Sequence, residues 1–298
     1  MGAVLVCYIG PTVSDGMSSM IIDGFKKLKS LNIHLASDPS LPGFYKRCKT
    51  AHLVLVGTNQ GVDWRIVRNI ARCHDRWAIL DGSDYSDFKG IKKVDPAQVP
   101  LIFKREFYPA DHDESRVFPL SFSVMNGWHE RPYREDDTFI DFSFAGREYK
   151  IRHPFMRTMR SLRNPHSIVS AGGLTSSQYW AMMDASKIGV SLRGAGWDCV
   201  RTFEILSRPN CLLMLQKPPI RMCEPELEDG VHCAMFETPT ELKEKIRHYL
   251  AHEDERLRIA RAGYELACQK HLTQHRAKYV FRTCLQNIPS VKEAVQSH

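Results

Sequence analysis

Residues 188–206 read IGVSLRGAGWDCVRTFEIL. The apolar run Ile188–Leu192 has the length and composition of a short strand. A Gly-x-Gly turn follows it, and Val200–Leu206 then has the composition of a helix. Ligands of open parallel sheets bind beyond the carboxyl ends of the strands. This strand–turn–helix unit therefore predicts an α/β fold and marks the turn as a candidate binding site.

The alternation of strands and helices continues through the C-terminal half of the chain. The pattern predicts strands over Phe139–Ala145, Ser167–Ser170 and Cys211–Leu215, and helices over Pro154–Leu162, Gln178–Ala185, Glu255–Lys270 and Gln274–Leu285. Thr238-Pro239-Thr240-Glu241 predicts a further helix start, with Thr at the cap, Pro at the first helical position and Glu three residues after the cap.

The N-terminal half has the same organisation at first and a looser one later. Predicted strands are Ala3–Ile9, His52–Val56 and Trp77–Leu80, with helices after Met17 and Trp64 and short extended pieces at Leu101–Phe103 and Val117–Leu120. Short apolar strands separated by amphipathic helices are typical of a parallel sheet covered on both faces. We therefore expect two Rossmann-like doubly wound domains facing a cleft.

Length and composition agree with two domains. A chain of 298 residues is longer than most single domains, and its 43% hydrophobic residues supply enough apolar side chains for two cores. Gly127, Pro132 and a mixed charge run suggest a junction within residues 121–138. We place an N-terminal domain at 1–125 and a C-terminal domain with a helical tail at 126–298.

The net charge, the cysteines and the hydropathy limit the kinds of ligand and of structural framework that the chain can have. The net charge of +7 is mild and spread along the chain, so it favours an anionic ligand without identifying one. The nine cysteines form no CxxC pair, and their number is odd, so we expect buried thiols rather than a zinc cluster or a disulfide framework. No apolar run has the length of a membrane span, and we expect a cytoplasmic protein.

The turn at 193–204 carries the densest group of candidate binding residues. Gly194 and Gly196 let backbone N–H groups approach a phosphate, and a helix N-terminus adds positive potential. Glu204 is placed to accept hydrogen bonds from ribose hydroxyls, and Arg201 to neutralise a diphosphate. Gly-x-Gly alone is a weak signal, and a plain strand–turn–helix is the alternative. The nucleotide-binding residues predicted here are Arg193, Gly194, Gly196, Trp197, Asp198, Arg201 and Glu204.

This stretch resembles the donor site of GT-B glycosyltransferases, most closely the spore-maturation-like (CgeB-type) and exostosin-like groups. Shorter similarities lie at Phe103–Glu106, at Val117–Phe122 and at Phe236–Leu242, so the resemblance extends over about residues 75–280 in patches. It implies that Glu204 binds the donor ribose and that the two glycines face the sugar-phosphate. Many retaining members carry two glutamates separated by seven residues, but Gly196 stands where the first would be, so the stereochemical outcome stays open.

A second candidate group follows the predicted strand Phe139–Ala145. The resemblance suggests Arg147 as the residue that holds the diphosphate, with Lys150 or Arg152 as alternates and Gly146 beside them. Cations clustered after a strand would stabilise the departing nucleotide without a metal. The alternative is a solvated basic loop.

Acidic residues follow two of the predicted strands in the N-terminal half. Asp15, in the turn after the first strand, is a candidate general base because an acceptor hydroxyl must lose its proton as the glycosidic bond forms. An N-capping role is the alternative for Asp15. The segment Asp81–Asp84 is only a weak indication of a metal site, since a turn with Asx caps explains the same residues. We predict no metal site and no cofactor other than the donor substrate.

The leading hypothesis is a metal-independent hexosyltransferase-like enzyme. Its C-terminal domain would bind a UDP- or GDP-sugar, and its N-terminal domain a saccharide or small-molecule acceptor. One alternative is a glycosyltransferase acting on a hydroxymethylated base in DNA, which would bind with a steep salt dependence. The other is a non-catalytic nucleotide-binding module on a degenerate GT-B scaffold.

Overall fold

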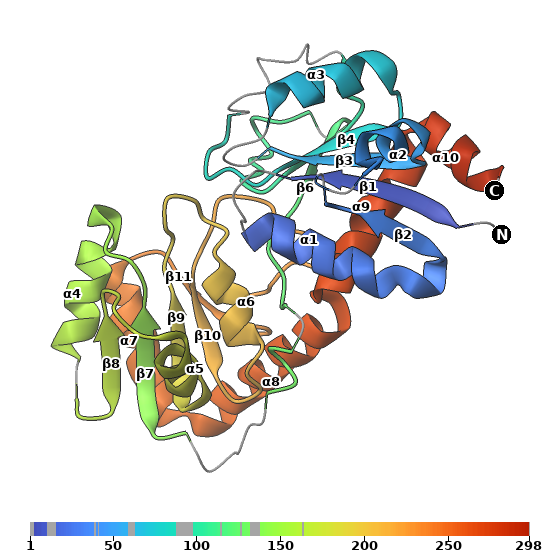
Figure 1. The fold of residues 1–298 in the computed structure, drawn as a ribbon. Coiled ribbons are helices and arrows are strands. Elements are labelled where there is room, and N and C mark those ends of the chain that lie inside the picture. Colours follow the sequence, from blue (N-terminus) through green and yellow to red (C-terminus); the bar gives the residue numbers. More distant parts are fainter. Residues whose placement is uncertain are drawn as a thin grey trace. The chain divides into compact units, whose positions relative to one another are not determined.

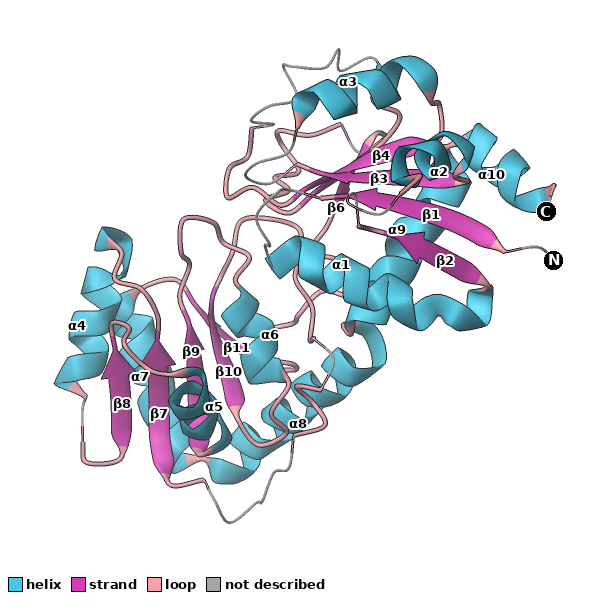
Figure 2. Cartoon of the chain, viewed as in Figure 1, coloured by secondary structure: helices cyan, strands magenta, loops and turns pink. Residues whose placement is uncertain are grey.

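The computed structural model describes residues 3–10, 16–38, 40, 42–58, 63–87, 98–113, 115–125, 127–131, 138–162 and 164–297. The chain forms two compact units. Unit 1 comprises Met1–Ser123, Ile220–Cys223 and Leu272–His298, and unit 2 comprises Val124–Pro219 and Glu224–His271. Each unit contains one parallel sheet with helices, so the predicted pair of Rossmann-like domains is confirmed (Figures 1 and 2).

Unit 1 is built on a six-stranded parallel sheet of order β2-β1-β3-β4-β5-β6. In the central part of the sheet, Val6 of β1 pairs with Leu35 on one side and Leu53 on the other. The strand bounds are β1 Val4–Ile9, β2 Ile33–Ala36, β3 Leu53–Gly57, β4 Trp77–Asp81, β5 Ile102–Lys104 and β6 Val117–Pro119.

Two apolar cores cover the two faces of this sheet. Alternate residues of β1 point to opposite faces, as strand geometry requires. Val6 packs in a core with helices α1, α9 and α10, whereas Cys7 packs in a core with α2 and α3. The helices are α1 Gly16–Lys27, α2 Phe44–Thr50, α3 Trp64–Cys73, α9 Thr273–Asn287 and α10 Pro289–Gln296, with a 3-10 helix at Leu28–Leu31.

The C-terminal helices belong to unit 1, which corrects the domain assignment made from sequence. Residues 272–298 were assigned to the C-terminal domain, but α9 packs directly on α1. A side chain at Gly24 would place its Cβ 2.2 Å from the carbonyl oxygen of Thr273, so only glycine allows this approach. Thr273 also donates a hydrogen bond to Asp23 at 2.5 Å. Close packing between the two helices therefore fixes the tail on the first sheet.

Unit 2 is built on a five-stranded parallel sheet of order β11-β10-β9-β7-β8. Helices α4, α7 and α8 pack on one face, and α5 and α6 lie over the other (Figure 1). The elements are β7 Ile140–Ala145, α4 His153–Ser161, β8 Ser167–Ser170, α5 Ser176–Asp184, β9 Ser186–Ser191, α6 Val200–Leu206, β10 Leu212–Gln216, β11 Ala234–Phe236, α7 Pro239–Ala251 and α8 Glu253–Lys270.

The strand order of unit 2 positions the candidate site. The chain moves from β7 to β8 on one side and then returns to add β9 on the other side of β7. The connections therefore diverge at the carboxyl ends of β7 and β9, and ligands of open parallel sheets bind at such a switch point. The loops that follow Ala145 and Ser191 leave the sheet there. In the described part of the chain, no helix is both long and apolar enough to cross a membrane.

Candidate functional site

One buried arginine joins the two loops at the switch point of unit 2. Arg152 stands at the end of the 3-10 helix Lys150–Arg152 and is only 4% exposed. Its Nε donates to the carbonyl of Arg193 at 2.7 Å, and its two Nη atoms donate to the carbonyls of Arg147 and Leu192 at 2.6 and 3.1 Å. Charge-assisted hydrogen bonds of this kind are stronger than neutral ones. Arg152 therefore fixes the loop after β7 against the loop after β9.

The three basic residues predicted in the first loop have different environments. Arg152 is buried, and its burial together with the nearby Arg201 lowers its pKa. The side chains of Arg147 and Lys150 are exposed, so they face solvent at the edge of the same loop. This arrangement gives Arg152 a positioning role. Contact of Arg147 or Lys150 with a ligand remains a prediction.

Arg201 brings the helix after the Gly-x-Gly turn to the end of β7. Its Nε donates to the carbonyl of Ala145 at 2.8 Å, and its guanidinium lies 4.8 Å from the centre of the Phe144 ring. Its Nη1 is buried and has no hydrogen-bond partner among the described residues. A buried donor without a partner is costly, and a phosphate oxygen would satisfy it. Arg201 is therefore the best-placed cation of the site.

Gly146 provides the space that Arg201 occupies. A Cβ at this position would lie 2.2 Å from Nη2 of Arg201. The guanidinium is held by the Phe144 ring and by the Ala145 carbonyl, so it cannot move away without losing both contacts.

Gly146→Ala is therefore expected to displace the Arg201 guanidinium. Because that displacement removes a cation from the site, nucleotide affinity should fall by about tenfold or more. Calorimetric titration with UDP measures this effect, and a melting temperature close to that of the wild type would separate it from misfolding. Gly172→Ala in the neighbouring loop is not a neutral control, since Gly172 has a positive φ of 127°. Ser161→Ala on the exposed end of α4 is suitable.

Glu204 lies about one helical turn after Arg201 and is hydrogen-bonded to a tyrosine from another helix. The Tyr179 hydroxyl donates to Oε2 of Glu204 at 2.5 Å. Burial raises the pKa of Glu204, while the hydrogen bond from Tyr179 and the charge of Arg201 lower it. Burial and the neighbouring Glu204 also raise the pKa of Tyr179. Tyr179 was not predicted as a site residue, because its pairing with Glu204 spans 25 positions of sequence.

The Gly-x-Gly turn is closed by backbone hydrogen bonds. The amide of Gly194 donates to the carbonyl of Gly196 at 2.9 Å, and the amide of Arg193 donates to the side-chain oxygen of Gln216 at 3.1 Å. The Arg193 guanidinium lies 4.3 Å from the centre of the Trp197 ring. Gln216, at the end of β10, is a further residue that the sequence patterns did not reveal.

The acidic residue that follows this turn is buried. Asp198 is 3% exposed and directly precedes Cys199, whose pKa is raised mainly by burial. The structure thus brings together Gly146, Arg152, Arg193, Gly194, Gly196, Trp197, Asp198, Arg201 and Glu204 in the loops and helix at the switch point. Their roles in binding a ligand remain predictions.

Of the acidic residues predicted in the N-terminal half, the structure describes Asp81 and Asp84, whereas Asp15 lies outside the described residues. Asp81, at the end of β4, accepts a hydrogen bond from Lys104 Nζ at 2.9 Å, and Asp84 forms an ion pair with Arg105. Carboxylates paired with cations in this way are poor metal ligands. Among the described residues, no group of three or more His, Cys, Asp or Glu side chains is arranged to hold a metal.

A comparison with known families identifies the family of the chain. A family model described as "Glycosyl transferase-like" matches residues 131–282, which is half of the chain and contains every predicted donor-site residue. The chain belongs to this glycosyl transferase-like family. No curated protein sequence matches it significantly.

Solved GT-B structures share the fold at low sequence identity. A glycosyltransferase from Rickettsia africae has a TM-score of 0.67 at 9% identity, with 96% of this chain and 99% of that chain covered. An α-glucosyltransferase in complex with UDP-glucose and DNA containing an abasic site has a TM-score of 0.65 at 8% identity, with 95% and 100% covered. Anabaena HepE in complex with UDP has a TM-score of 0.59 at 11% identity, with 94% and 99% covered.

Proposed function

We propose that this protein transfers a hexosyl group from a nucleoside diphosphate sugar to an acceptor hydroxyl, without a metal. The observation that carries the proposal is the buried, unpartnered Nη1 of Arg201 at the switch point, beside the Tyr179–Glu204 pair. Arg201 and Glu204 lie about one helical turn apart, so the cation could bind the diphosphate of a donor while the carboxylate accepts hydrogen bonds from its ribose. Family membership over residues 131–282 supports the same reaction.

In the proposed reaction, the bond between the anomeric carbon and the diphosphate oxygen breaks while a bond to the acceptor oxygen forms. Negative charge develops on the departing nucleoside diphosphate, and Arg201, with the exposed Arg147 and Lys150, would stabilise it. Glu204 would accept hydrogen bonds from the ribose hydroxyls. The acceptor proton passes to a general base, for which Asp15 remains the candidate.

UDP-glucose is the first donor to test. The structures of the α-glucosyltransferase and of Anabaena HepE contain UDP or UDP-glucose, and both share this fold. Affiliation with the spore-maturation-like or exostosin-like group is part of the proposal and rests on the resemblance of residues 194–204. The cytoplasmic location likewise rests on the sequence.

DNA carrying a hydroxymethylated base is the second candidate acceptor. Two structures of the α-glucosyltransferase that shares this fold contain DNA with a hydroxymethyluracil base. The net charge of +7 is compatible with a polyanionic acceptor. Affinity for a 13-mer duplex should then fall steeply with salt, because phosphate contacts release counterions. A flat salt dependence would favour a saccharide or another small acceptor.

A panel of nucleotides followed by a transfer assay tests the proposed function. Stabilisation of the protein by UDP and UDP-glucose in a thermal-shift assay, with no comparable effect of CMP, is the expected result. Incubation with radiolabelled UDP-glucose and a mixture of acceptors should then release UDP. Binding without release of UDP in the presence of any acceptor would favour a non-catalytic nucleotide-binding module, and no binding at all would contradict the donor site.

Tyr179→Phe is expected to change the pH dependence of donor binding. The hydrogen bond from Tyr179 lowers the pKa of Glu204, so its loss should raise that pKa further. Donor binding that needs the ionised carboxylate should therefore weaken at a higher pH in the variant than in the wild type, and remain close to wild type at alkaline pH. Titrations with UDP-glucose across the acid range measure this shift. Superimposable pH profiles would show that Tyr179 does not act through Glu204.

A further inference from the structure

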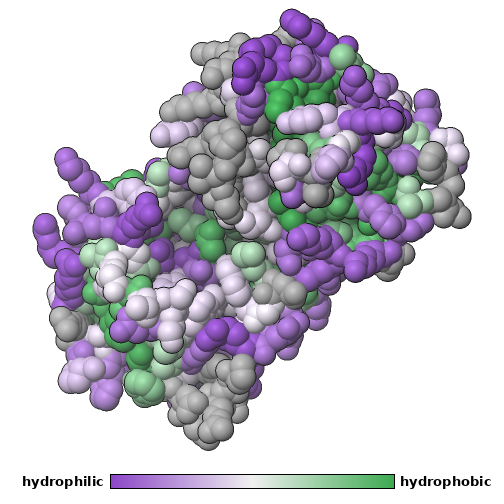
Figure 3. Space-filling model, in the orientation of Figure 1, coloured by the Kyte–Doolittle hydropathy of each residue, from purple (hydrophilic) through white to green (hydrophobic). Residues whose placement is uncertain are grey.

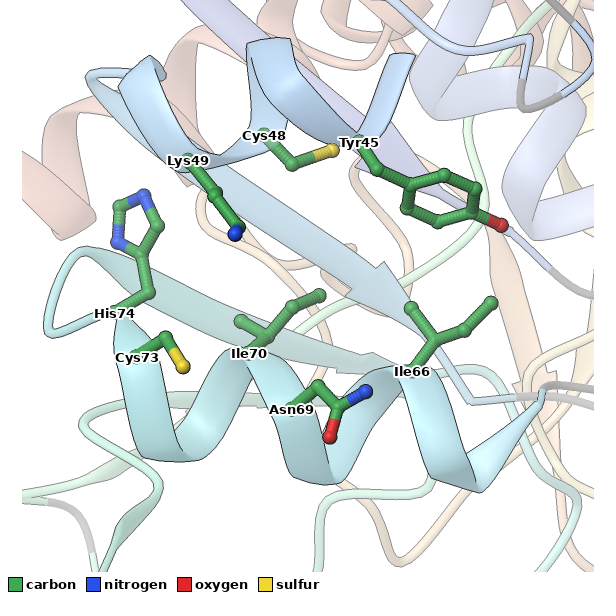
Figure 4. Close-up of a pocket in the computed structure, with 8 residues that line it drawn as sticks. All are labelled: Tyr45, Cys48, Lys49, Ile66, Asn69, Ile70, Cys73 and His74. Atoms are coloured by element: carbon green, nitrogen blue, oxygen red, sulfur yellow. The ribbon is translucent and has the colours of Figure 1, made fainter. Parts of the chain in front are cut away.

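Unit 1 contains a pocket between helices α2 and α3 (Figure 4). Its volume is about 430 Å³, within the range of small-molecule sites. Among the described residues, the side chains that line it come from α2, from α3 or from the residue after α3. They are Tyr45, Cys48, Lys49, Ile66, Asn69, Ile70, Cys73 and His74.

The inner wall of this pocket is apolar. Cys48 and Ile70 are buried members of the core beneath α2 and α3, and Ile66 packs against the same core. The ring of Tyr45, which is 49% exposed, stands at one end of the pocket (Figure 4). An apolar wall of this kind favours an aliphatic or aromatic group through the area it removes from water.

The pocket has one cationic side chain among its polar groups. Lys49 extends toward the interior, and Asn69 lies across from it on α3 (Figure 4). His74 Nδ1 accepts a hydrogen bond from the backbone amide of Arg76 at 3.1 Å. Burial lowers the pKa of the same ring, but the ring also lies close enough to the Cys48 backbone for a hydrogen bond that raises this pKa, so His74 joins the end of α3 to α2 at the side of the pocket. The pocket thus offers the ammonium group of Lys49 and the amide of Asn69 to a ligand.

The two helices that form the pocket are basic throughout. Neither contains an Asp or Glu, and together they carry Lys46, Arg47, Lys49, Arg65, Arg68 and Arg72. Of these, Arg65 forms an ion pair with Asp63 at 3.0 Å. In Figure 3, hydrophilic surface surrounds hydrophobic surface in the region where Figure 1 places α2 and α3. A lysine beside an apolar wall, on two helices of positive net charge, complements a molecule with an apolar body and one anionic group.

We infer that the α2–α3 pocket is a second binding site, distinct from the donor site of unit 2, for a small anionic amphiphile. Its apolar body would lie against Ile66 and Ile70, and its carboxylate, sulfonate or phosphate would bind Lys49. A polyphosphate has no apolar group that could pack against the apolar wall of the pocket. A nucleic acid strand would require a series of stacked aromatic side chains, and the described lining offers only the rings of Tyr45 and His74.

Protection of Cys73 from alkylation locates the ligand directly. Cys73 lines the pocket and is exposed, whereas Cys48 is buried. Decanoate serves as the probe. We expect decanoate to slow the reaction of Cys73 with iodoacetamide and to leave the slower reactions of Cys199 and Cys268 unchanged. Mass spectrometry of the alkylated peptides measures these rates. Decanol should protect at least about tenfold less well, because it lacks the charge that pairs with Lys49.

Matched variants separate pocket binding from general attraction to a basic surface. Lys49→Glu should weaken protection by decanoate by about tenfold or more, whereas Lys46→Glu changes the same charge outside the pocket and should have a small effect. Asn69→Trp should fill the pocket and abolish protection, and Arg72→Trp is its control on the same helix. Melting temperatures establish that each variant is folded.

Three outcomes would overturn the inference. Decanoate could fail to protect Cys73, or protect it equally in Lys49→Glu and Lys46→Glu. Alternatively, the protein could sediment with vesicles of anionic phospholipid while decanoate gives no protection of Cys73. If Lys49→Glu and Lys46→Glu then reduced this sedimentation equally, the basic helices would be a membrane-binding surface and not a small-molecule site. None of these outcomes affects UDP binding, so the inference and the proposed function fail independently.

Discussion

Asp81→Asn is expected to lower the free energy of unfolding by about 3–5 kcal/mol, the usual cost of removing one partner of a buried ion pair. Lys104 Nζ lies 2.9 Å from Oδ2 of Asp81, and the two side chains are 0% and 4% exposed. Asparagine keeps the size of the side chain but leaves the ammonium of Lys104 without its counter-charge. Urea denaturation, fitted with separate transitions if the two units unfold independently, measures the loss.

The pH dependence of this variant provides an internal check. Burial already lowers the pKa of Lys104, and Asp81 opposes that shift. In Asp81→Asn the pKa should fall further, so the folded protein binds fewer protons than the unfolded chain at alkaline pH. Stability should therefore rise with pH through the lowered pKa of Lys104 and recover part of the loss.

Two control variants test whether the loss comes from an uncompensated buried charge. Adding Lys104→Met to Asp81→Asn removes that charge and should restore much of the stability. Glu237→Gln breaks the exposed pair with Lys217, whose side chains are 61% and 58% exposed, and should cost about 0–1 kcal/mol. Equal small effects of Asp81→Asn and Glu237→Gln would contradict the assignment of a buried pair.

Arg152→Met is expected to have the largest combined effect on stability and ligand binding. The substitution leaves the carbonyls of Arg147, Leu192 and Arg193 without their donor, and a buried acceptor left unsatisfied costs about 1–3 kcal/mol. Water can hydrogen-bond some of these carbonyls in the variant, so we expect the free energy of unfolding to fall by about 2–4 kcal/mol. The loops after β7 and β9 would no longer be joined, and affinity for UDP should fall by about tenfold or more.

Arg157→Met is the matched control for this variant. Arg157 lies on α4, is exposed, and carries the same charge, so its loss should change stability by no more than about 0.5 kcal/mol. UDP affinity measured below the melting temperature of Arg152→Met separates the two effects. Wild-type affinity in a folded Arg152→Met protein would show that the two loops hold the ligand without this arginine.

The sequence was most informative where the apolar pattern is strong. The predicted strand Ser167–Ser170 and the predicted helix Val200–Leu206 have the bounds that the structure gives to β8 and α6. Thr238 caps α7 as expected, since its side chain accepts a hydrogen bond from the amide of Glu241. Long apolar or periodic segments and cap residues act locally, so the sequence alone identifies them.

Elements with weak local patterns were missed. The edge strand β2 has four residues with mixed exposure, and β11 has three. Helix α2 reads FYKRCKT and buries only Phe44 and Cys48, so it lacks the apolar periodicity of a longer helix. Pairing with β1 stabilises β2, pairing with β10 stabilises β11, and packing on the core stabilises α2. Such tertiary contacts are not visible in a short window of sequence.

The candidate site was predictable in its location but not in its internal contacts. The turn at 193–204 was found because strand, glycines and helix follow one another directly. The hydrogen bond from Tyr179 to Glu204, the bonds from Arg152 to the turn after β9 and the pair of Lys104 with Asp81 join residues that are 23 to 41 positions apart. Which side chains meet across such distances depends on strand order, which the sequence pattern leaves open.

Calorimetric titration of UDP-glucose into the wild type and Glu204→Ala tests the central claim most directly. The account predicts measurable binding to the wild type and a loss of about 1–3 kcal/mol in binding free energy for the variant, the cost of removing a charge-assisted hydrogen bond. Glu237→Ala, which removes an exposed carboxylate directly after β11, should bind as the wild type does. Equal affinity of wild type and folded Glu204→Ala for UDP-glucose would contradict the donor site at the switch point of unit 2.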